Sequence, residues 1–301
     1  MVRLSLVVPA TDDPPTLGGC LESARTAAHP PDELVVVTEP RRAGPAAARN
    51  EGAERATGDV LVFVDADVLV HRDAFTRIRA AFAGDPELVA VFGSYDDRVV
   101  TESIVAGFRN LLHHVVHQRS AGEARTFWAG LGAVRATTFH EVGGFDADRY
   151  PRPSIEDVEL GGRLAERGRI VLDPSLQGTH LKEWTLGSMV VTDFARRGVP
   201  WVRLMTDRRE VPATLNLGAR ERASAALALV AALALVRRRR AVAAAAVAAG
   251  VALNADLYRT VVRRLGMRGL GAAIPLHVLH QLVGAAAVPA ALAARLRRRA
   301  R

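Results

Sequence analysis

Two aspartates separated by one residue follow a short, wholly apolar segment. Asp65 and Asp67 come directly after Val60–Val64, a run of residues typical of a buried β-strand. Ligands of open α/β sheets collect beyond the carboxyl ends of the strands, so both carboxylates can turn toward one hard cation there. Mg²⁺ and Mn²⁺ prefer oxygen ligands and take their remaining positions from a substrate diphosphate. The pattern therefore predicts a divalent-metal site, with a solvated surface turn as the alternative.

The segments around these aspartates alternate between apolar runs and helical patterns, as a sheet with crossover helices requires. Short β-rich runs predict strands at Leu4–Val8, Glu33–Val37, Val60–Val64 and Leu88–Phe92. Amphipathic or alanine-rich stretches predict helices at Thr16–Ala28, Ala46–Ala56 and Asp73–Ala83, with Thr16 as a candidate N-cap. This alternation favours an α/β fold whose mostly parallel sheet is covered by helices on both faces.

The middle of the chain is less regular than its beginning. The patterns predict helices at Thr101–Gln118, Thr137–Glu141 and Glu156–Arg167, and strands at Trp128–Val134 and Ile170–Leu172. The character changes near Gly218. We therefore expect a catalytic domain over residues 1–218 and a hydrophobic helical tail over residues 219–301.

Charge is divided unevenly between these two parts. The tail from Ala219 to Arg301 has 15 arginines and 2 acidic residues, a net charge of +13 in a chain of net charge +8, which leaves −5 for residues 1–218. The arginine clusters flank runs of Ala, Leu and Val, which suits anionic lipid headgroups better than a nucleic-acid duplex. We expect membrane lipids as a partner and no nucleic acid.

The lengths of the apolar runs in the tail leave its membrane topology open. Ala223–Val236 and Ala241–Leu253 are each only ~20 Å long as helices, too short for a hydrocarbon core of ~30 Å. Leu270–Ala294 is long enough, but it contains two prolines and two histidines. Membrane contact is the favoured interpretation because the two acidic residues of the tail cannot balance its 15 arginines. A buried helical bundle and a shallow or in-plane hairpin are the alternatives.

The amino-terminal residues and the cysteine content bear on the compartment. Leu4–Val8 is too short for a secretory signal and ends at Pro9, so we expect a cytoplasmic catalytic domain at the cell membrane. Cys20 is the only cysteine, which excludes a disulfide within the chain and disfavours a cysteine zinc site. We expect Cys20 to be a small buried apolar residue.

Seven segments of the chain resemble, in order, the motifs of family 2 glycosyltransferases of the GT-A fold. These segments are Val7–Asp13, Glu33–Val37, Gly44–Gly52, Gly58–Asp67, Trp128–Arg135, Gly143–Asp146 and Ile155–Asp157. His180 falls where many GT-A enzymes have a late histidine. The resemblance covers more than half of the chain and none of the tail.

This resemblance implies the transfer of a sugar from a nucleoside diphosphate to an acceptor, with inversion at the anomeric carbon. It assigns the general base to Asp157, next to Glu156, because an attacking hydroxyl needs a carboxylate within hydrogen-bond reach. It assigns the divalent metal, Mg²⁺ or Mn²⁺, to Asp67 with Asp65 and His180. Metal held there would stabilise the negative charge of the departing diphosphate.

The resemblance also assigns residues to the two substrates. The residues expected to bind the nucleotide-sugar donor are Pro9, Asp12, Asp13, Glu39, Arg49 and Asp65. Trp128, Gly130 and Gly132 are expected to bind the acceptor. The chain departs from the family after its second strand, where Thr38 and Glu39 replace the usual acidic pair, so Glu39 is expected to replace the aspartate.

The tail suggests a lipid-linked or membrane-proximal acceptor, and we expect a lipid-linked or glycan acceptor as a partner. The chain lacks the Q-x-x-R-W motif of processive synthases, so we expect transfer of a single sugar. Two other functions compete with this hypothesis. The first is a nucleotidyltransferase, which would use a similar metal site. Against it, no glycine-rich phosphate loop with a lysine follows the first strand. A catalytically degenerate transferase domain serving as a membrane adaptor is the second alternative.

Overall fold

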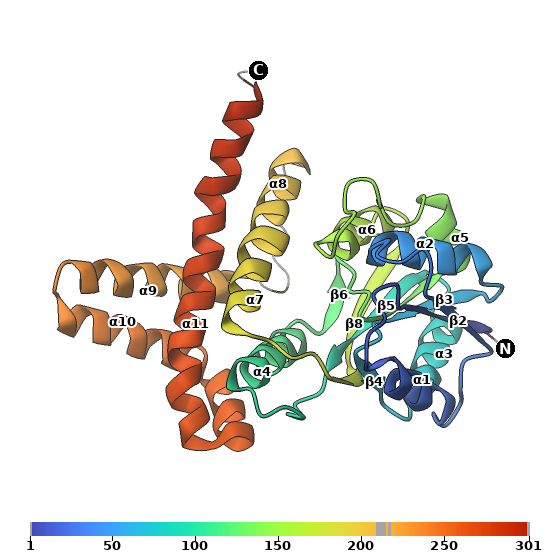
Figure 1. Cartoon of the computed structure of the whole chain (residues 1–301), viewed down its shortest axis with the longest axis horizontal. Coiled ribbons are helices and arrows are strands. Elements are labelled where there is room, and N and C mark those ends of the chain that lie inside the picture. Colours follow the sequence, from blue (N-terminus) through green and yellow to red (C-terminus); the bar gives the residue numbers. More distant parts are fainter. Residues whose placement is uncertain (1, 209–214, 216–217, 300–301) are drawn as a thin grey trace. The chain divides into compact units, whose positions relative to one another are not determined.

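The computed structural model describes residues 2–208, 215 and 218–299, and the chain forms two compact units (Figure 1). The sheet unit comprises residues 1–96 and 117–182, and the helical unit comprises residues 97–116 and 183–301. The helical unit thus includes residues before Gly218, among them an excursion from the middle of the sheet unit. The assignment of catalysis to residues 1–218 and of membrane association to residues 219–301 stays a prediction.

The sheet unit is built on one eight-stranded sheet in the order β2-β1-β3-β7-β5-β8-β4, with β6 also paired to β8. The strands are β1 Leu4–Pro9, β2 Glu33–Val37, β3 Val60–Val64, β4 Val68–Val70, β5 Leu88–Tyr95, β6 Gly122–Ala124, β7 Leu131–Arg135 and β8 Arg169–His180. Strands β1, β2, β3, β5 and β8 run in one direction, because β7 is antiparallel to both β3 and β5. The expected mostly parallel α/β sheet is confirmed.

Three strands run against the others, and the sequence patterns did not reveal this. Strand β7 lies between β3 and β5, with Gly132 opposite Phe63 on one side and Phe92 on the other. Strands β4 and β6 both pair with β8 in the antiparallel sense. Strand β8 itself continues well beyond the expected Leu172 and ends at His180. A central strand buried on both faces reads as apolar whichever way it runs.

Helices flank both faces of the sheet, as expected. They are α1 Leu17–Arg25, α2 Pro45–Arg55, α3 Ala74–Gly84, α5 Ala136–Glu141 and α6 Glu156–Leu164. Figure 1 shows α1 and α3 on one side of the sheet and α2, α5 and α6 on the other. Thr16 occupies the N-cap position of α1, but its side chain makes no capping hydrogen bond. Helix α2 begins with Pro45 after Gly44, whose positive φ of 84° suits a glycine.

The helical unit contains the carboxyl-terminal helices and most of α4. Its elements are α4 Ile104–Arg119, α7 Leu186–Val191, the π-helix η1 Thr192–Gly198, α8 Val199–Arg208, α9 Ala219–Val236, α10 Arg240–Leu253 and α11 Ala255–Arg299. Helix α11 is interrupted at Gly266, whose backbone is not helical (φ 66°, ψ −170°). By length and composition alone, α11 is the one helix of the described chain that could span a membrane.

The core of the helical unit joins α4 to α11. Phe108 and Leu111 of α4 and Leu257, Val261 and Ala273 of α11 are buried in one apolar cluster. Polar side chains also lie inside the helical unit, where they form hydrogen bonds with each other. This is the pattern of a packed helical core with internal polar contacts.

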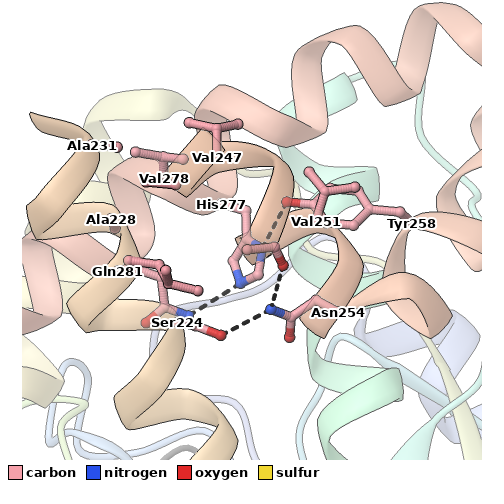
Figure 2. A pocket seen from close by; sticks show the side chains of 13 residues that line it. Ser224, Ala228, Ala231, Val247, Val251, Asn254, Tyr258, His277, Val278 and Gln281 are labelled. Carbon is pink, nitrogen blue, oxygen red and sulfur yellow. Dashed lines mark hydrogen bonds between the residues drawn. The ribbon is translucent and has the colours of Figure 1, made fainter. Parts of the chain in front are cut away.

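Figure 2 shows one set of these polar contacts, around a narrow cavity of about 20 Å³. Asn254 donates to Ser224 Oγ at 2.8 Å, and Tyr258 Oη lies 2.9 Å from His277 Nδ1. The cavity has room for a water molecule and not for a substrate.

Candidate active site at the rim of the sheet

The turn between β3 and β4 carries the two aspartates and is held by backbone hydrogen bonds. Asp65 N donates to Gly130 O at 3.1 Å, and Asp65 O accepts from Val68 N at 3.0 Å. Leu181 N donates to Asp67 O at 2.8 Å. The turn is thus fixed to the residues that precede β7 and follow β8. It lies at the carboxyl end of β3, where the sequence placed it.

Arg49 of α2 connects this turn to the start of α6. Its Nη2 atom lies 2.6 Å from Asp65 Oδ1, and its Nη1 atom lies 3.1 Å from Glu156 Oε1. Both Arg49 and Glu156 are buried, and the Arg49 guanidinium lies 5.4 Å from the centroid of the Phe145 ring. Its predicted role in donor binding stays a prediction. The structure gives it protein carboxylates as partners.

Asp157, the predicted base, lies at the same rim. Its Oδ2 atom accepts a hydrogen bond from Ala129 N at 3.3 Å, and its Oδ1 atom accepts one from Val158 N at 2.8 Å. Ala129 is followed directly by Gly130, whose carbonyl oxygen binds the backbone of Asp65. The half-buried Asp157 carboxylate and the aspartate turn are therefore hydrogen-bonded to the backbone of two consecutive residues, Ala129 and Gly130. Glu156, its neighbour, points instead to Arg49.

His180 meets Asp67 at the end of β8. The distance from His180 Nε2 to Asp67 Oδ2 is 3.6 Å. The buried imidazole stacks on the Tyr95 ring, with centroids 4.0 Å apart and planes inclined by 10°. Tyr95 is thus a residue of this site that the sequence did not single out. His180 thus lies beside Asp67, and its role in metal binding stays a prediction.

The two aspartates of the turn differ in their electrostatic environments. Burial raises the pKa of Asp65, the charge of Asp67 raises it further, and Arg49 opposes both effects. Burial alone would also raise the pKa of Asp67, but the adjacent His180 imidazole and the charge of Lys182 lower it. Asp67 is therefore the carboxylate of this pair that is held in its charged form.

The side chains at the rim carry an excess of negative charge, which favours the binding of a cation. Four carboxylates (Asp65, Asp67, Glu156 and Asp157) lie near two permanent cations, Arg49 and Lys182, which leaves a formal charge of −2 apart from His180. Among the described residues no group of three or more His, Cys, Asp or Glu side chains is arranged to hold a metal alone. One or two carboxylates that leave the other positions to waters and phosphates are the usual protein share of an Mg²⁺ site. The residues present fit that arrangement.

The predicted acceptor-binding strip is tightly packed. Trp128 is 9% exposed, and its ring meets the rings of Tyr95 and His117 edge-on, at centroid distances of 4.8 and 5.3 Å. A Cβ atom added at Gly130 would collide with the Trp128 indole, and one at Gly132 would collide with the Trp128 carbonyl oxygen. These glycines are explained by packing. Their contact with an acceptor stays a prediction.

The predicted donor-binding loops lie side by side at the ends of β1 and β2. Arg42 N donates to Thr11 O at 3.0 Å, and Arg41 Nη2 lies 3.6 Å from Asp13 Oδ2. Glu39 Oε2 accepts from Arg41 N at 2.8 Å.

Three of the acidic side chains predicted to bind the donor, those of Asp12, Asp13 and Glu39, are exposed at this end of the sheet. Pro9 is the last residue of β1 and is paired with Val37 of β2. The structure thus gathers the predicted donor residues on one edge. Their contact with a nucleotide stays a prediction.

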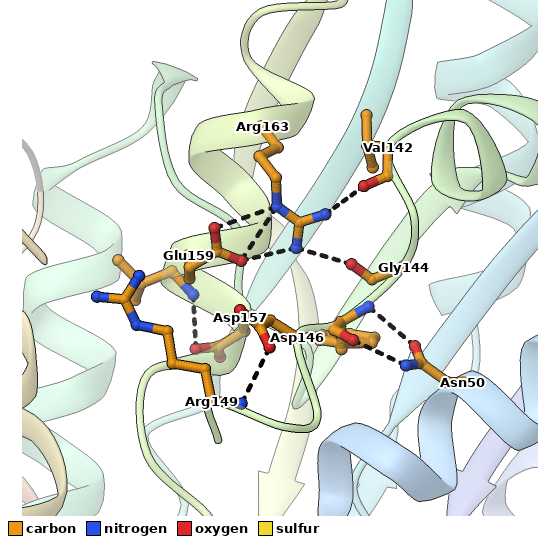
Figure 3. A network of polar contacts seen from close by, with 10 residues as sticks. Asn50, Val142, Gly144, Asp146, Arg149, Asp157, Glu159 and Arg163 are labelled. Atoms are coloured by element: carbon orange, nitrogen blue, oxygen red, sulfur yellow. Dashed lines mark hydrogen bonds and ion pairs between the residues drawn. The ribbon is translucent and has the colours of Figure 1, made fainter. Parts of the chain in front are cut away.

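A second network of polar contacts fastens the loop before α6 (Figure 3). Asn50 donates to Phe145 O and accepts from Phe145 N, both at 2.8 Å. Arg163 is paired with Glu159 on its own helix at 2.6 Å and donates to Gly144 O at 2.7 Å. Asn50 follows Arg49 directly, so one turn of α2 holds both the aspartate turn and this loop. Asn50 belongs to the Gly44–Gly52 motif, but its hydrogen-bond partner, Phe145, lies 95 residues further along the chain. The sequence therefore did not reveal this contact.

Cys20 of α1 lies beneath the aspartate turn. Its Sγ atom is 3.6 Å from the backbone oxygen of Asp65, and the residue is fully buried. Burial, with the charges of Asp65 and Asp67, raises the pKa of this thiol to about 12. Its expected character as a small buried residue is confirmed, because the neutral thiol behaves as an apolar side chain.

Part of the chain matches a known family model and curated bacterial enzymes. The model described as Glycosyl transferase family 2 matches residues 35–122. The Pre-mycofactocin glycosyltransferase of Mycobacterium tuberculosis is 30% identical over 164 residues, covering 50% of this chain and 34% of that protein. The Poly-beta-1,6-N-acetyl-D-glucosamine synthase of Staphylococcus aureus is 26% identical over 166 residues, covering 52% and 39%. The matches thus span little more than a third of these curated relatives.

Among solved structures, the mannosyltransferase PcManGT of Pyrobaculum calidifontis, in complex with GDP-Man and Mn²⁺, is similar in fold. The TM-score is 0.56 with 18% sequence identity, over 95% of this chain and 87% of that one. At this identity the likeness concerns the fold.

Proposed function

We propose that the chain is a family 2 glycosyltransferase with a GT-A fold, which transfers a single sugar from a nucleoside-diphosphate sugar to a membrane-proximal acceptor. The observation that carries the proposal is the convergence of Asp65, Asp67 and Asp157 on one rim, joined through Gly130 and Ala129. An aspartate turn for a cation and a second carboxylate for a proton are what this reaction needs.

Asp157 is the proposed general base. The attacking hydroxyl oxygen of the acceptor forms a bond to the anomeric carbon, while the bond from that carbon to the diphosphate oxygen breaks. The hydroxyl proton passes to the Asp157 carboxylate, and the nucleoside diphosphate leaves with the bonding electrons. Attack from the face opposite the leaving group inverts the anomeric configuration. The hydrogen bond from Ala129 N fixes one carboxylate oxygen for this task.

Asp67 is the proposed principal metal ligand, with His180 and Asp65 beside it. Its lowered pKa supports this role, because an ionised carboxylate binds a hard cation. When bound, Mg²⁺ or Mn²⁺ would stabilise the charge that develops on the departing diphosphate. Arg49 keeps Asp65 in place from inside the protein, so we assign it a positioning role. Exposed Lys182 is the nearby cation for the diphosphate itself.

The tail supports an acceptor at the membrane. Its net charge of +13 and its apolar helices suit a cytoplasmic face of the cell membrane, where a lipid-linked acceptor would be presented. The proposed partners are a nucleotide-sugar donor, a lipid-linked or glycan acceptor and membrane lipids.

A panel of nucleotide sugars tests the proposal. The full chain is incubated with each donor, GDP-mannose included, and with Mg²⁺ or Mn²⁺, and release of nucleoside diphosphate is measured with and without membrane extracts as the acceptor source. We expect release with one donor and a product that gains one sugar by mass spectrometry. Release of pyrophosphate from a nucleoside triphosphate and a sugar phosphate would instead indicate a nucleotidyltransferase. Donor binding without turnover across the whole panel would indicate an adaptor.

A further inference from the structure

Helices α9 and α10 form a hairpin that is apolar on its outer faces as well as its inner ones. The two helices pack through small buried residues: Ser224, Ala228, Ala231 and Ala234 on α9, and Ala243 and Ala246 on α10. On the outer side of α9, Leu229 is 50% exposed, Leu233 51% and Val236 81%. A helix that is hydrophobic all round belongs in a protein core or in lipid. Nothing in the described part of the helical unit covers these outer faces.

The tip of the hairpin carries four consecutive arginines, Arg237–Arg240, all exposed. Within the described residues no acidic side chain forms an ion pair with any of them. Four unneutralised guanidinium groups beside apolar helices match the phosphates of anionic phospholipids in both charge and position.

An open apolar groove begins beside Arg240. It has a volume of about 680 Å³ and is lined by Ala244, Val247 and Val251 of α10 and by Ile274 of α11. An open apolar surface of this extent suits a hydrocarbon chain, whereas the cavity of about 20 Å³ beside Asn254 and His277 does not. A basic end and an apolar length together match one phospholipid molecule.

The lengths of the two helices decide how the hairpin meets the bilayer. Helix α9 has 18 residues and α10 has 14, so they measure ~27 and ~21 Å, against ~30 Å for the hydrocarbon core. A hairpin inserted tip first would bury four arginines in hydrocarbon, which is unfavourable. If it lies along one leaflet, the arginines stay among the headgroups while the apolar faces enter the acyl region.

We propose that the α9–α10 hairpin docks on an anionic phospholipid leaflet, with Arg237–Arg240 on the lipid phosphates and Leu229 and Leu233 in the acyl region. The inference rests on the membrane-proximal part of the proposed function and names the element responsible. Helix α11 is a packed element of the helical unit: His277 contacts Tyr258 and His280 contacts Asp193, at 2.9 and 2.8 Å.

Vesicle co-sedimentation of the full chain tests the docking surface. Vesicles of phosphatidylcholine alone are compared with vesicles containing phosphatidylglycerol. With all four of Arg237–Arg240 replaced by Gln, we expect binding to the anionic vesicles to weaken on the order of 1,000-fold. The Leu229→Ser/Leu233→Ser variant should lose binding to both kinds of vesicle. The matched control is Val288→Ser/Leu292→Ser on α11, where both residues are 45% exposed, and it should bind like the wild type.

Three results would overturn the inference. The arginine variant could bind anionic vesicles as tightly as the wild type, or the α11 control could lose binding equally. Light scattering could also show that the Leu229→Ser/Leu233→Ser variant converts a dimer to a monomer with vesicle binding unchanged, which would assign the surface to a second copy of the chain. Thermal melting checks that each variant is folded. Vesicle binding needs no sugar donor, so a chain that binds vesicles but transfers no sugar contradicts only the proposed function.

Discussion

The Nη2 atom of Arg49 lies 2.6 Å from Oδ1 of Asp65, and the other arm of the same guanidinium reaches Glu156 at 3.1 Å. One buried cation thus joins the aspartate turn after β3 to the first turn of α6, although Arg49 and Glu156 are 107 residues apart. The relative positions of the metal turn and the proposed base, Asp157, therefore depend on a residue that need not touch substrate.

Replacing Arg49 with Met should destabilise the protein strongly. Glu156 would be left buried without its partner, and breaking a buried ion pair from one side costs roughly 3–5 kcal/mol. Urea denaturation followed by circular dichroism measures the change. The control is Arg77→Met, which breaks the exposed pair with Asp73 and should cost about 1 kcal/mol or less. Equal effects of the two substitutions would mean that the buried bridge is energetically unimportant.

Asp157→Asn should lower the turnover rate roughly 10²–10⁴-fold, because an amide cannot accept the hydroxyl proton. Donor binding should change little, since the substitution keeps the shape of the side chain that accepts from Ala129 N. Steady-state kinetics and donor titration separate the two effects. The exposed Asp148→Asn variant is the control. Wild-type turnover by Asp157→Asn would remove Asp157 as the base.

Asp67→Ala should abolish the part of donor binding that depends on divalent metal. The substitution removes the carboxylate that is held ionised beside His180, at 3.6 Å. Calorimetric titration with nucleoside diphosphate, with and without Mn²⁺, measures the loss. Asp148→Ala should leave the metal dependence intact. If Asp67→Ala titrates as the wild type does in Mn²⁺, the metal is held elsewhere or is not used.

Glu33→Gln should reveal a pH-dependent contribution to stability. The hydrogen bonds from the Ser5 hydroxyl and from Thr57 N lower the pKa of Glu33 in the folded chain. A lowered folded-state pKa means that the ionised side chain stabilises the fold above the unfolded pKa of about 4.3, and that this contribution is lost as the pH falls through the folded value.

The urea midpoint of Glu33→Gln should therefore lie below that of the wild type at pH 7, and the gap should narrow as the pH falls below about 4. The exposed Glu54→Gln variant controls for the loss of a charge alone. A gap that stays constant from pH 7 into acid would show that the carboxylate charge does not stabilise this edge of the sheet.

Removing residues 219–301 should damage more than membrane contact. Leu257, Val261 and Ala273 would be lost from the apolar cluster that buries Phe108 and Leu111 of α4. Each uncovered large side chain forfeits ~1.5–3 kcal/mol of burial. We expect the truncated chain to aggregate or to melt well below the full chain in calorimetry. A truncated chain that is monomeric and equally stable would show that α4 packs independently of the tail.

The sequence alone predicted most of the elements of the sheet unit and indicated candidate site residues at their ends. The apolar runs of β1, β2 and β3 match their predicted bounds within one residue, because buried strands differ from amphipathic helices in residue type and spacing. Asp65 directly follows β3 and Asp157 lies in the first turn of α6, so both are at the ends of predicted elements, while their chemical roles stay predictions. Strand β4 has only three residues, which is too short for a recognisable sequence pattern.

Only the tertiary structure decided which elements are neighbours. Periodicity tells which face of a strand or helix is buried but not what covers it, so the antiparallel place of β7 and the excursion of α4 into the helical unit were not predictable. The Arg49 bridge, the stacking of His180 on Tyr95 and the fastening of Phe145 by Asn50 join residues distant in sequence. Such contacts depend on strand order, and strand order is set by the packing of the whole sheet.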